Sequence, residues 1–476
     1  MKLSTQLRED TGYGWVMARL EPVSPFGHAL ARSPRWYGPG EEGPLEEEFS
    51  RVEALRALLD AGEPALDSLT HILSQFRDLR NSLRRPTNAP MDEMELFEVK
   101  YFLLHLERLA QTYALIPALE GMEIQSMEES LNLLDPSGRR LPAFSVENAF
   151  APALERVRAE KALVEGRLRQ AEGTERDGLM ACRRSLVERE NQLELEARKG
   201  LTMSLLRQRE SLLAAMEAVG RLDLLLAKAR LARRFSCCRP EITKQPRVEA
   251  ADMVHPEAAA YLGERGGSFT AVSLTLERGT TVITGANMGG KSVSMKSLTL
   301  NLLLAQTGFF TFAGAFSAPL FHSVCLICTD RQSVEQGLSS FGAEMSALGA
   351  VLREEKDKFF YIALDEFARG TNPREGAALA RALAEYLGRL NCVALMTTHY
   401  DGVSDAARRH YRVAGLGALD TAALHKDGAP LEHLSRLMDY HLIEAKPGEP
   451  CPRDALRVCR LLDLDPALME IFLKNH

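Results

Sequence analysis

The residues best suited to chemistry lie together in one octapeptide, 285–292, with the sequence GANMGGKS. It follows the apolar run 281–284 and precedes a helix-like stretch, which is the setting of a G-x-x-x-x-G-K-[ST] phosphate-binding loop. The glycines let the backbone turn sharply and direct its N–H groups inward. Lys291 is suited to β- and γ-phosphates, and the Ser292 hydroxyl to Mg²⁺. We therefore predict a site for a nucleoside triphosphate, taken to be ATP, with magnesium.

Two carboxylates follow the apolar run 359–364, at Asp365 and Glu366. A hydrophobic strand that ends in Asp commonly supports Mg²⁺ beside a nucleotide. Glu366 is then placed to orient or deprotonate the attacking water. Acid pairs at strand ends are often only solvated, but Asp365 lies 73 residues after Ser292. This spacing favours a catalytic pair.

His399 closes a further strand-like run, 392–396, after two threonines. A histidine at the carboxyl edge of a sheet can contact a γ-phosphate and respond to its presence. A single histidine is more often structural. Its place at a third strand end favours a catalytic role beside Lys291 and Glu366.

Composition limits the class of protein. The chain has 476 residues, enough for about two or three domains, with 45% hydrophobic and 26% charged residues, as in soluble globular proteins. The net charge of −7 excludes a general polyanion binder, so any nucleic-acid surface must be a local patch. Eight cysteines are too few for a disulfide scaffold, and with ATP use they predict a cytoplasmic protein.

A C-x-x-C pair and a long uncharged stretch are both best explained as buried structure, not as a metal site or a membrane span. Cys325 and Cys328 form a C-x-x-C within an apolar run, where they would lie on opposite faces of a strand, so buried structural cysteines are expected. The uncharged stretch 298–321 is long enough to cross a membrane. It is interrupted by Gly308, Gly314 and Pro319, which favours a buried helix followed by a strand. The N-terminus has no secretory signal pattern.

The pattern along the chain predicts a multidomain α + α/β fold. Residues 151–200 carry two short apolar seams, typical of an antiparallel coiled-coil hairpin whose tip lies near 173–178. The seams are Leu154, Val157, Val164 and Leu168, then Leu179, Cys182, Leu186 and Leu193. The six predicted segments are an irregular 1–45, a helical core over 46–150, the hairpin over 151–200, helices over 201–245, an α/β domain over 246–430 and a helical tail over 431–476.

Four blocks of sequence carry a family resemblance. They are GANMGGKS, then 337–345 (GLSSFGAEM), then 364–371 (LDEFARGT), then 398–400 (THY). In this order they resemble the ATPase domain of the MutS family over about 248–415. The resemblance implies an ABC-type P-loop domain over 246–430 and lever helices over 201–245.

The same resemblance implies roles for individual residues. Asn287 and Lys291 would contact the nucleotide, Ser292 and Asp365 the magnesium, and Glu366 the hydrolytic water. The block with Ser339 and Ser340 would reach the γ-phosphate of a partner subunit, giving a dimer, identical or with a related chain, with composite sites. The full set expected at the nucleotide is Gly285, Asn287, Met288, Gly289, Gly290, Lys291, Ser292, Val293, Ser339 and Ser340. Departures from the family pattern at Ala286, Ser340, Ala368 and 372–373 remove no catalytic group.

Two other classes of protein are disfavoured by the sequence. In structural-maintenance ATPases a hairpin separates the phosphate loop from the acidic strand, whereas here it precedes both. A mismatch reader would need a Phe-x-Glu wedge, which none of the 19 phenylalanines provides. Neither a mismatch reader nor a C-terminal nuclease extension is expected.

The target of the ATPase is the least determined feature. The hairpin has 11 Lys or Arg and 10 Asp or Glu, and this balance favours a protein-facing surface over DNA. The segments 437–442 and 452–457 resemble the MutS-like ATPase of a lysine 5,6-aminomutase reactivase. The leading hypothesis is therefore an ATPase that remodels such a protein client. The alternative is a MutS-like protein acting on duplex, mismatched or branched DNA in repair or recombination.

Overall fold

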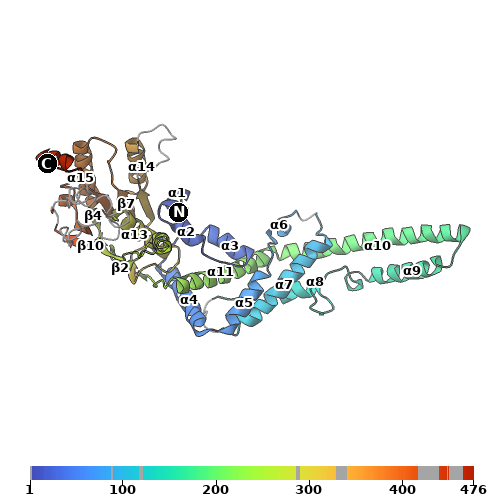
Figure 1. The fold of residues 1–476 in the computed structure, drawn as a ribbon. Coiled ribbons are helices and arrows are strands. Elements are labelled where there is room, and N and C mark those ends of the chain that lie inside the picture. The colour runs from blue at the N-terminus through green and yellow to red at the C-terminus, as the bar shows by residue number, and fades with distance from the viewer. Residues whose placement is uncertain are drawn as a thin grey trace. The chain divides into compact units, whose positions relative to one another are not determined.

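The computed structural model describes residues 3–86, 89–116, 122–285, 290–328, 340–415, 439–446, 449 and 465–475. The chain divides into two compact units. We call the first the sheet unit (Met1–Glu21, Ser33–Arg56 and Lys228–His476) and the second the helical unit (Pro22–Arg32 and Ala57–Ala227). The expected combination of α and α/β parts is confirmed at this level (Figure 1).

In its described residues the helical unit has no strand. Its longest core helix, α7 (Glu93–Tyr113), starts with a capping box between Asp92 and Glu95, which satisfies N–H groups that no helical carbonyl can reach. The face of α7 with Phe102, Leu103 and Leu106 is buried and packs on α5 and α8. The helices of this unit are α3 (Pro25–Arg32), α5 (Pro64–Ser74), α6 (Arg80–Leu83), α7, α8 (Glu128–Leu134), the short η1 (Asn148–Phe150), α9 (Pro152–Leu168), α10 (Gly173–Arg207), and parts of α4 (Glu42–Ala61) and α11 (Arg209–Arg234).

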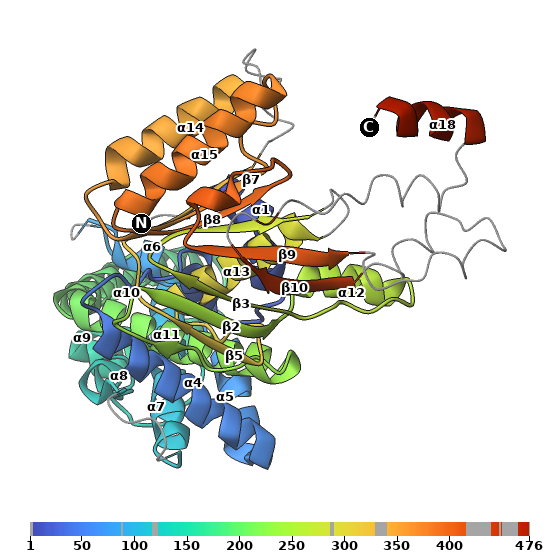
Figure 2. The same ribbon diagram turned by 90° about the vertical axis from the view of Figure 1, so that its left-hand side faces the viewer.

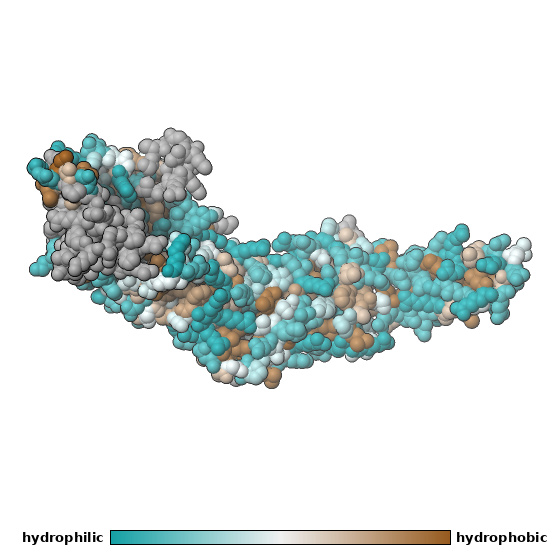
Figure 3. Space-filling view, in the orientation of Figure 1, coloured by the Kyte–Doolittle hydropathy of each residue, from teal (hydrophilic) through white to brown (hydrophobic). Residues whose placement is uncertain are grey.

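The predicted hairpin is present as α9 packed on α10, but charged groups contribute more to its seam than expected. Arg158 donates to Glu190 (2.9 Å) and Glu194 (2.8 Å), and Lys161 also pairs with Glu190. Cys182, expected in the seam, is exposed. Figure 3 shows a mostly hydrophilic surface over these helices.

Two details of the hairpin differ from the prediction. The turn lies at 169–172, because α9 ends at Leu168 and α10 begins at Gly173. The predicted tip, 173–178, therefore forms the first turns of α10. No break occurs at residue 200 either, since α10 continues to Arg207.

Within the helical unit, α3 is held by a buried carboxylate on α11. Asp223, only 1% exposed, accepts hydrogen bonds from the Val23 and Ser24 amides and from the Ser24 hydroxyl at 2.6–3.1 Å. The carboxylate thus satisfies N–H groups at the start of α3 that would otherwise lack partners. A Cβ on Gly27 would lie 2.1 Å from an Asp223 oxygen, so this approach requires glycine.

The sheet unit contains two sheets. The six-stranded sheet has the order β10-β9-β4-β8-β7-β6, and all neighbours are parallel except the β10–β9 pair. Its strands are β4 (Gly279–Thr284), β6 (Ser323–Ile327), β7 (Phe360–Asp365), β8 (Cys392–Thr398), β9 (Arg409–Gly415) and β10 (Asp439–Ala445). The four-stranded sheet has the order β1-β5-β2-β3, formed by β1 (Glu241–Ile242), β2 (Arg247–Met253), β3 (Val272–Glu277) and β5 (Ala315–Ala318).

Helices cover both faces of the six-stranded sheet, as predicted for a parallel sheet. Figure 2 shows α14 (Ser340–Glu355) and α15 (Pro373–Arg389) over one face, where Phe360, Ile362 and Leu364 join their core. Tyr361 points to the opposite face, since its hydroxyl lies 3.3 Å from Thr299 on α13 (Lys291–Gln306). The remaining helices of this unit are α1 (Thr5–Asp10), α2 (Tyr13–Met17), α12 (Pro256–Glu264), η3 (Ser404–Ala406) and α18 (Pro466–Asn475).

Two segment predictions are wrong in part. The first 45 residues are not irregular, because they include α1, α2 and α3. Burial rather than local pattern explains this: Tyr13 is fully buried and its hydroxyl donates to Thr307 (3.1 Å). In the tail, 439–445 forms β10 instead of a helix, since it completes the edge of the six-stranded sheet beside β9.

The uncharged stretch 298–321 and the C-x-x-C pair lie in or beside mostly buried elements of the sheet unit. After the buried helix α13 the chain reaches the strand β5, as expected. Where the chain is described, none of the helices combines the length and the apolar character that a membrane span requires. Cys325 and Cys328 are both half-buried, and burial raises the pKa of the Cys325 thiol to about 11.

Candidate nucleotide and magnesium site

Three adjacent parallel strands bring the predicted groups to one edge of the sheet. β4 pairs with β8, and β8 pairs with β7, so their carboxyl ends lie side by side. In register, Thr398 lies opposite Thr284, and Asp365 lies opposite Thr397. Gly285 follows β4, Glu366 follows β7 and His399 follows β8. The order of strands, which no local pattern specifies, therefore assembles the site.

Glycines at both ends of the phosphate loop have backbone angles that disfavour other residues. Gly285 has φ 145° and Gly290, the N-cap of α13, has φ 75°. A Cβ on Gly285 would lie 3.1 Å from Val413 Cβ, and one on Gly290 would lie 3.0 Å from the Tyr440 ring. Both positions need glycine for backbone angle and for space. Ala286, Asn287, Met288 and Gly289 lie outside the described residues.

Lys291 begins α13 and is 3% exposed. Its Nζ donates to the Gly285 carbonyl (2.6 Å) and lies 3.7 Å from Glu366 Oε1. A buried ammonium needs acceptors around it, and a carboxylate beside it holds it at the start of the helix. The structure thus places Lys291 and Glu366, predicted from separate motifs, next to one another.

A chain of hydroxyls and a carboxylate lies beside this pair. The Ser292 hydroxyl donates to Asp365 Oδ1 (2.8 Å), and the buried Thr397 hydroxyl donates to the same oxygen (2.6 Å). Magnesium prefers oxygen ligands and keeps several waters, so one carboxylate and one hydroxyl suit it. The residues therefore fit Mg²⁺. Among the described residues, no cluster of three or more His, Cys, Asp or Glu forms a separate metal site.

Glu366 is held by its backbone and by a second cation. Its N–H donates to the Thr397 carbonyl (3.1 Å) and hydroxyl (3.0 Å). Its Oε2 accepts from Arg369 Nη1 (2.5 Å), so the carboxylate lies between Arg369 and Lys291. Glu366 also has a φ of 48°, a left-handed backbone conformation that is unfavourable for residues other than glycine.

His399 is electrostatically coupled to the same groups. Burial lowers the pKa of His399; the Glu366 carboxylate raises it, while Lys291 and Arg369 lower it further. The ring is therefore neutral at neutral pH. Its buried Nδ1 has no hydrogen-bond partner in the described part of the chain. An orphaned ring nitrogen near Lys291 suits a ligand group that completes the site.

The remaining predicted residues are only partly described. Ser339 lies outside the described residues, and Ser340 begins α14 with its side chain outside them. Val293 lies in the first turn of α13. Their predicted contacts with nucleotide stay predictions.

Sequence reasoning missed four groups that shape the site: Thr397, Arg369, Glu344 and Tyr400. Thr397 gives a signal in the sequence, because it lies two residues before His399 at the same strand end. Glu344 on α14 could not be anticipated, since its contact with Ala368 (3.1 Å) crosses between separate elements.

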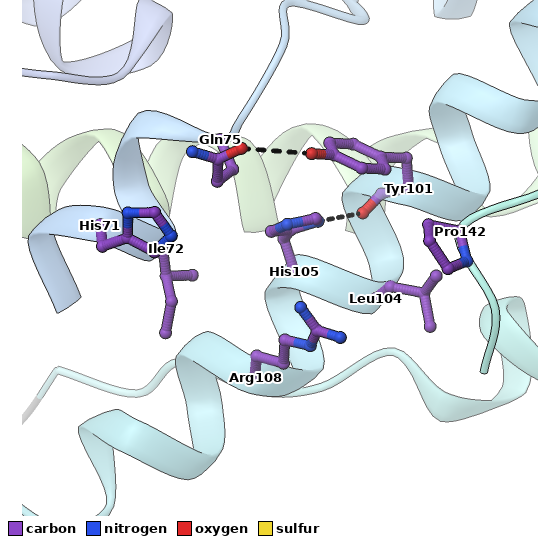
Figure 4. Close-up of a pocket in the computed structure, with 8 residues that line it drawn as sticks. All are labelled: His71, Ile72, Gln75, Tyr101, Leu104, His105, Arg108 and Pro142. Atoms are coloured by element: carbon purple, nitrogen blue, oxygen red, sulfur yellow. Dashed lines mark hydrogen bonds between the residues drawn. The ribbon is translucent and has the colours of Figure 1, made fainter. Parts of the chain in front are cut away.

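The helical unit contains a cavity of about 250 Å³, separate from the predicted nucleotide site (Figure 4). His105 Nδ1 lies 2.8 Å from the Tyr101 carbonyl, and Tyr101 donates to Gln75 (3.3 Å). Burial lowers the pKa of His105; the hydrogen bond to the Tyr101 carbonyl raises it, while the charges of Arg108 and His71 lower it further. The cavity is lined by His71, Ile72, Gln75, Tyr101, Leu104, His105, Arg108 and Pro142. It includes none of the residues predicted to bind nucleotide.

Comparison with known proteins identifies the class of the phosphate-loop segment. Residues 281–434 match the family model of MutS domain V. The chain is 35% identical over 277 residues to an endonuclease MutS2 of Thermomicrobium roseum, covering 56% of this chain and 32% of that protein. A second endonuclease MutS2, from Symbiobacterium thermophilum, is 30% identical over 262 residues, covering 55% of this chain and 30% of that protein.

A third endonuclease MutS2, from Staphylococcus epidermidis, is 34% identical over 193 residues, covering 40% of this chain and 24% of that protein. The matches span about a third or less of these relatives. They support the predicted relationship to the MutS family, through its domain V. The resemblance to an aminomutase reactivase is not supported by them.

Proposed function

We propose that this chain is a Mg²⁺-dependent ATPase of the MutS type that acts on DNA. One observation supports the ATPase assignment above all. At one edge of the sheet, Lys291 lies beside Glu366, and Ser292 donates a hydrogen bond to Asp365. The relatives named as endonucleases favour DNA over a protein client as the target. The leading hypothesis from sequence, the remodelling of an aminomutase, is therefore replaced by its alternative.

Each residue has a role that follows from its place. Lys291, buried at the N-terminus of α13, would hold the β- and γ-phosphates where the helix dipole also favours negative charge. Magnesium held by Ser292 and Asp365 would neutralise phosphate charge as the leaving group departs. Glu366 would orient the attacking water and accept its proton. His399, neutral and with Nδ1 unpaired among the described residues, would contact the γ-phosphate without adding a charge.

Glu366→Gln tests the ATPase assignment. The amide keeps the shape of the side chain but is not a base, so hydrolysis should fall by about 100-fold or more while ATP binding persists. Glu354→Gln, on the exposed end of α14, is the matched control and should retain full activity. Unchanged turnover in Glu366→Gln would show that Glu366 is not the base.

A dimer with shared ATP sites is part of the same proposal. In the MutS-type arrangement ATP closes the interface and hydrolysis reopens it. The hydrolysis-deficient Glu366→Gln chain should therefore be dimeric in ATP by light scattering. A monomer at micromolar concentration with ATP would exclude composite sites.

Binding to duplex and branched DNA tests the target. Contacts to phosphates release counterions, so affinity should fall steeply between 50 and 200 mM salt, by about 1,000-fold for six contacts. Because positive and negative residues are nearly equal in number in the hairpin, phosphate contacts there would have to come from a local cluster of Lys and Arg. No binding to either DNA at 50 mM salt would refute a DNA target while leaving the ATPase intact.

A further inference from the structure

The backbone that follows β7 contains two residues in the left-handed region. They are Glu366, with φ 48°, and Ala368, with φ 64°. Neither is glycine, and such conformations persist only where surrounding contacts hold them. The Thr397 contacts hold Glu366, so other contacts must stabilise the left-handed backbone of Ala368.

Ala368 is held at both of its peptide groups. Its N–H donates to Glu344 Oε2 (3.1 Å), and its carbonyl accepts from the Tyr400 hydroxyl (3.1 Å). Glu344 is 4% exposed, Tyr400 9% and Ala368 fully buried. A carboxylate acceptor makes the first of these a charge-assisted bond, stronger than one between neutral groups. Burial raises the pKa of Tyr400, and the negative charge of Glu344 raises it further, which agrees with their proximity.

The start of α15 leaves this arrangement no space to relax. A Cβ on Gly376 would lie 2.6 Å from the Tyr400 hydroxyl oxygen and 2.8 Å from the Ala368 carbonyl oxygen. Phe367, between Glu366 and Ala368, is 2% exposed in the core beneath α14 and α15. The two residues after Glu366 are thus fixed from α14, from the end of β8 and from α15.

We propose that Glu344 is a positioning residue that sets the orientation of the Glu366 carboxylate. It acts through the backbone of Ala368, which lies two residues along the chain from Glu366. Its position on α14 makes that helix part of the support of the catalytic carboxylate. The inference rests on the proposed ATPase function.

The test compares Glu344→Ala, Glu344→Gln and Tyr400→Phe with the exposed control Glu354→Ala on the same helix. Because a displacement of about 1 Å can cost about 100-fold in rate, Glu344→Ala should lower kcat by about 10- to 100-fold. The Kd for ATP, measured with a fluorescent analogue, should change less than about threefold. Glu344→Gln keeps an acceptor oxygen and should recover most of kcat. Tyr400→Phe should lower kcat without loss of binding, and it serves if Glu344→Ala does not fold.

Hydrogen exchange of the segment 366–369 gives a readout that does not depend on turnover. Glu344→Ala should speed exchange there, and Glu344→Gln should restore protection. The proposal is overturned if kcat and exchange are unchanged in Glu344→Ala, or if Glu344→Gln is as impaired as Glu344→Ala. If the wild-type chain binds ATP without hydrolysing it, the ATPase proposal fails. In that case, unchanged hydrogen exchange in Glu344→Ala would independently refute the proposal that Glu344 holds the backbone at Ala368.

Discussion

Replacing Thr397 by valine removes one hydroxyl that serves two functional residues. That hydroxyl donates to Asp365 Oδ1 (2.6 Å) and accepts from the Glu366 amide (3.0 Å), and Thr397 is fully buried. Valine has nearly the same volume, so no cavity forms. The loss is a hydrogen bond to a charged group, worth about 1.5–3 kcal/mol. The Glu366 amide keeps the Thr397 carbonyl as its acceptor (3.1 Å), so its contribution to the loss is small.

A loss of about 2 kcal/mol should lower Tm by roughly 4–8 °C for a domain of this size. Because the freed carboxylate of Asp365 is less well oriented toward Mg²⁺, kcat should fall by about 10-fold and half-saturation should need more Mg²⁺. ATPase rates titrated against Mg²⁺, with thermal unfolding in parallel, measure both effects. Thr397→Ser, which keeps the hydroxyl, is the control. Equal kcat, Mg²⁺ dependence and Tm in Thr397→Val and wild type would refute the reasoning.

Three further predictions concern backbone angle, pH and burial. Gly290→Ala should weaken ATP binding by about tenfold in a titration, because left-handed backbone costs about 1–2 kcal/mol and the Cβ meets Tyr440; unchanged affinity would contradict this. His255 caps α12, and burial lowers its pKa to about 4. The unfolded state therefore takes up a proton that the folded state does not, and stability should fall by about 3 kcal/mol as pH drops from about 6.5 to 4. His255→Asn should flatten that pH profile of urea unfolding, and an equally steep profile would exclude His255 as the cause. Asp223→Ala should destabilise the helical unit by about 3 kcal/mol in urea, since the half-buried Val23 amide and the buried Ser24 amide lose their acceptor. Asp223→Asn should be less affected, and equal unfolding midpoints for both variants and wild type would refute the contact.

The elements of the sheet unit that bear the site were largely predictable. The runs 281–284, 359–364 and 393–396 predict strands, and these are β4, β7 and β8. They are short apolar runs, each followed by residues suited to the proposed site, so the local pattern and the position in the sheet agree. The α9–α10 hairpin was also predicted, although its turn and its charged seam were not, because ion pairs across two helices leave no periodic signal.

Other parts depended on contacts that sequence does not display. The helices within 1–45 are short and stabilised by burial of residues such as Tyr13, so local propensity failed to indicate them. β10 forms only because β9 offers it an edge. The target of the ATPase was inferred from a charge count and a tail, and the comparisons favoured the other alternative.

The sequence by itself determined which groups are proposed to carry the chemistry: a phosphate loop with Lys291 and Ser292, and an acidic pair at Asp365 and Glu366. It did so because phosphate and magnesium require particular residue types at short, local spacing. Only the tertiary structure decided what orients them. Thr397 and Tyr400, at the end of β8, and Glu344, on α14, hydrogen-bond to the backbone of residues 366–368. Such support depends on which strands and helices become neighbours, and that is settled by packing rather than by any local pattern.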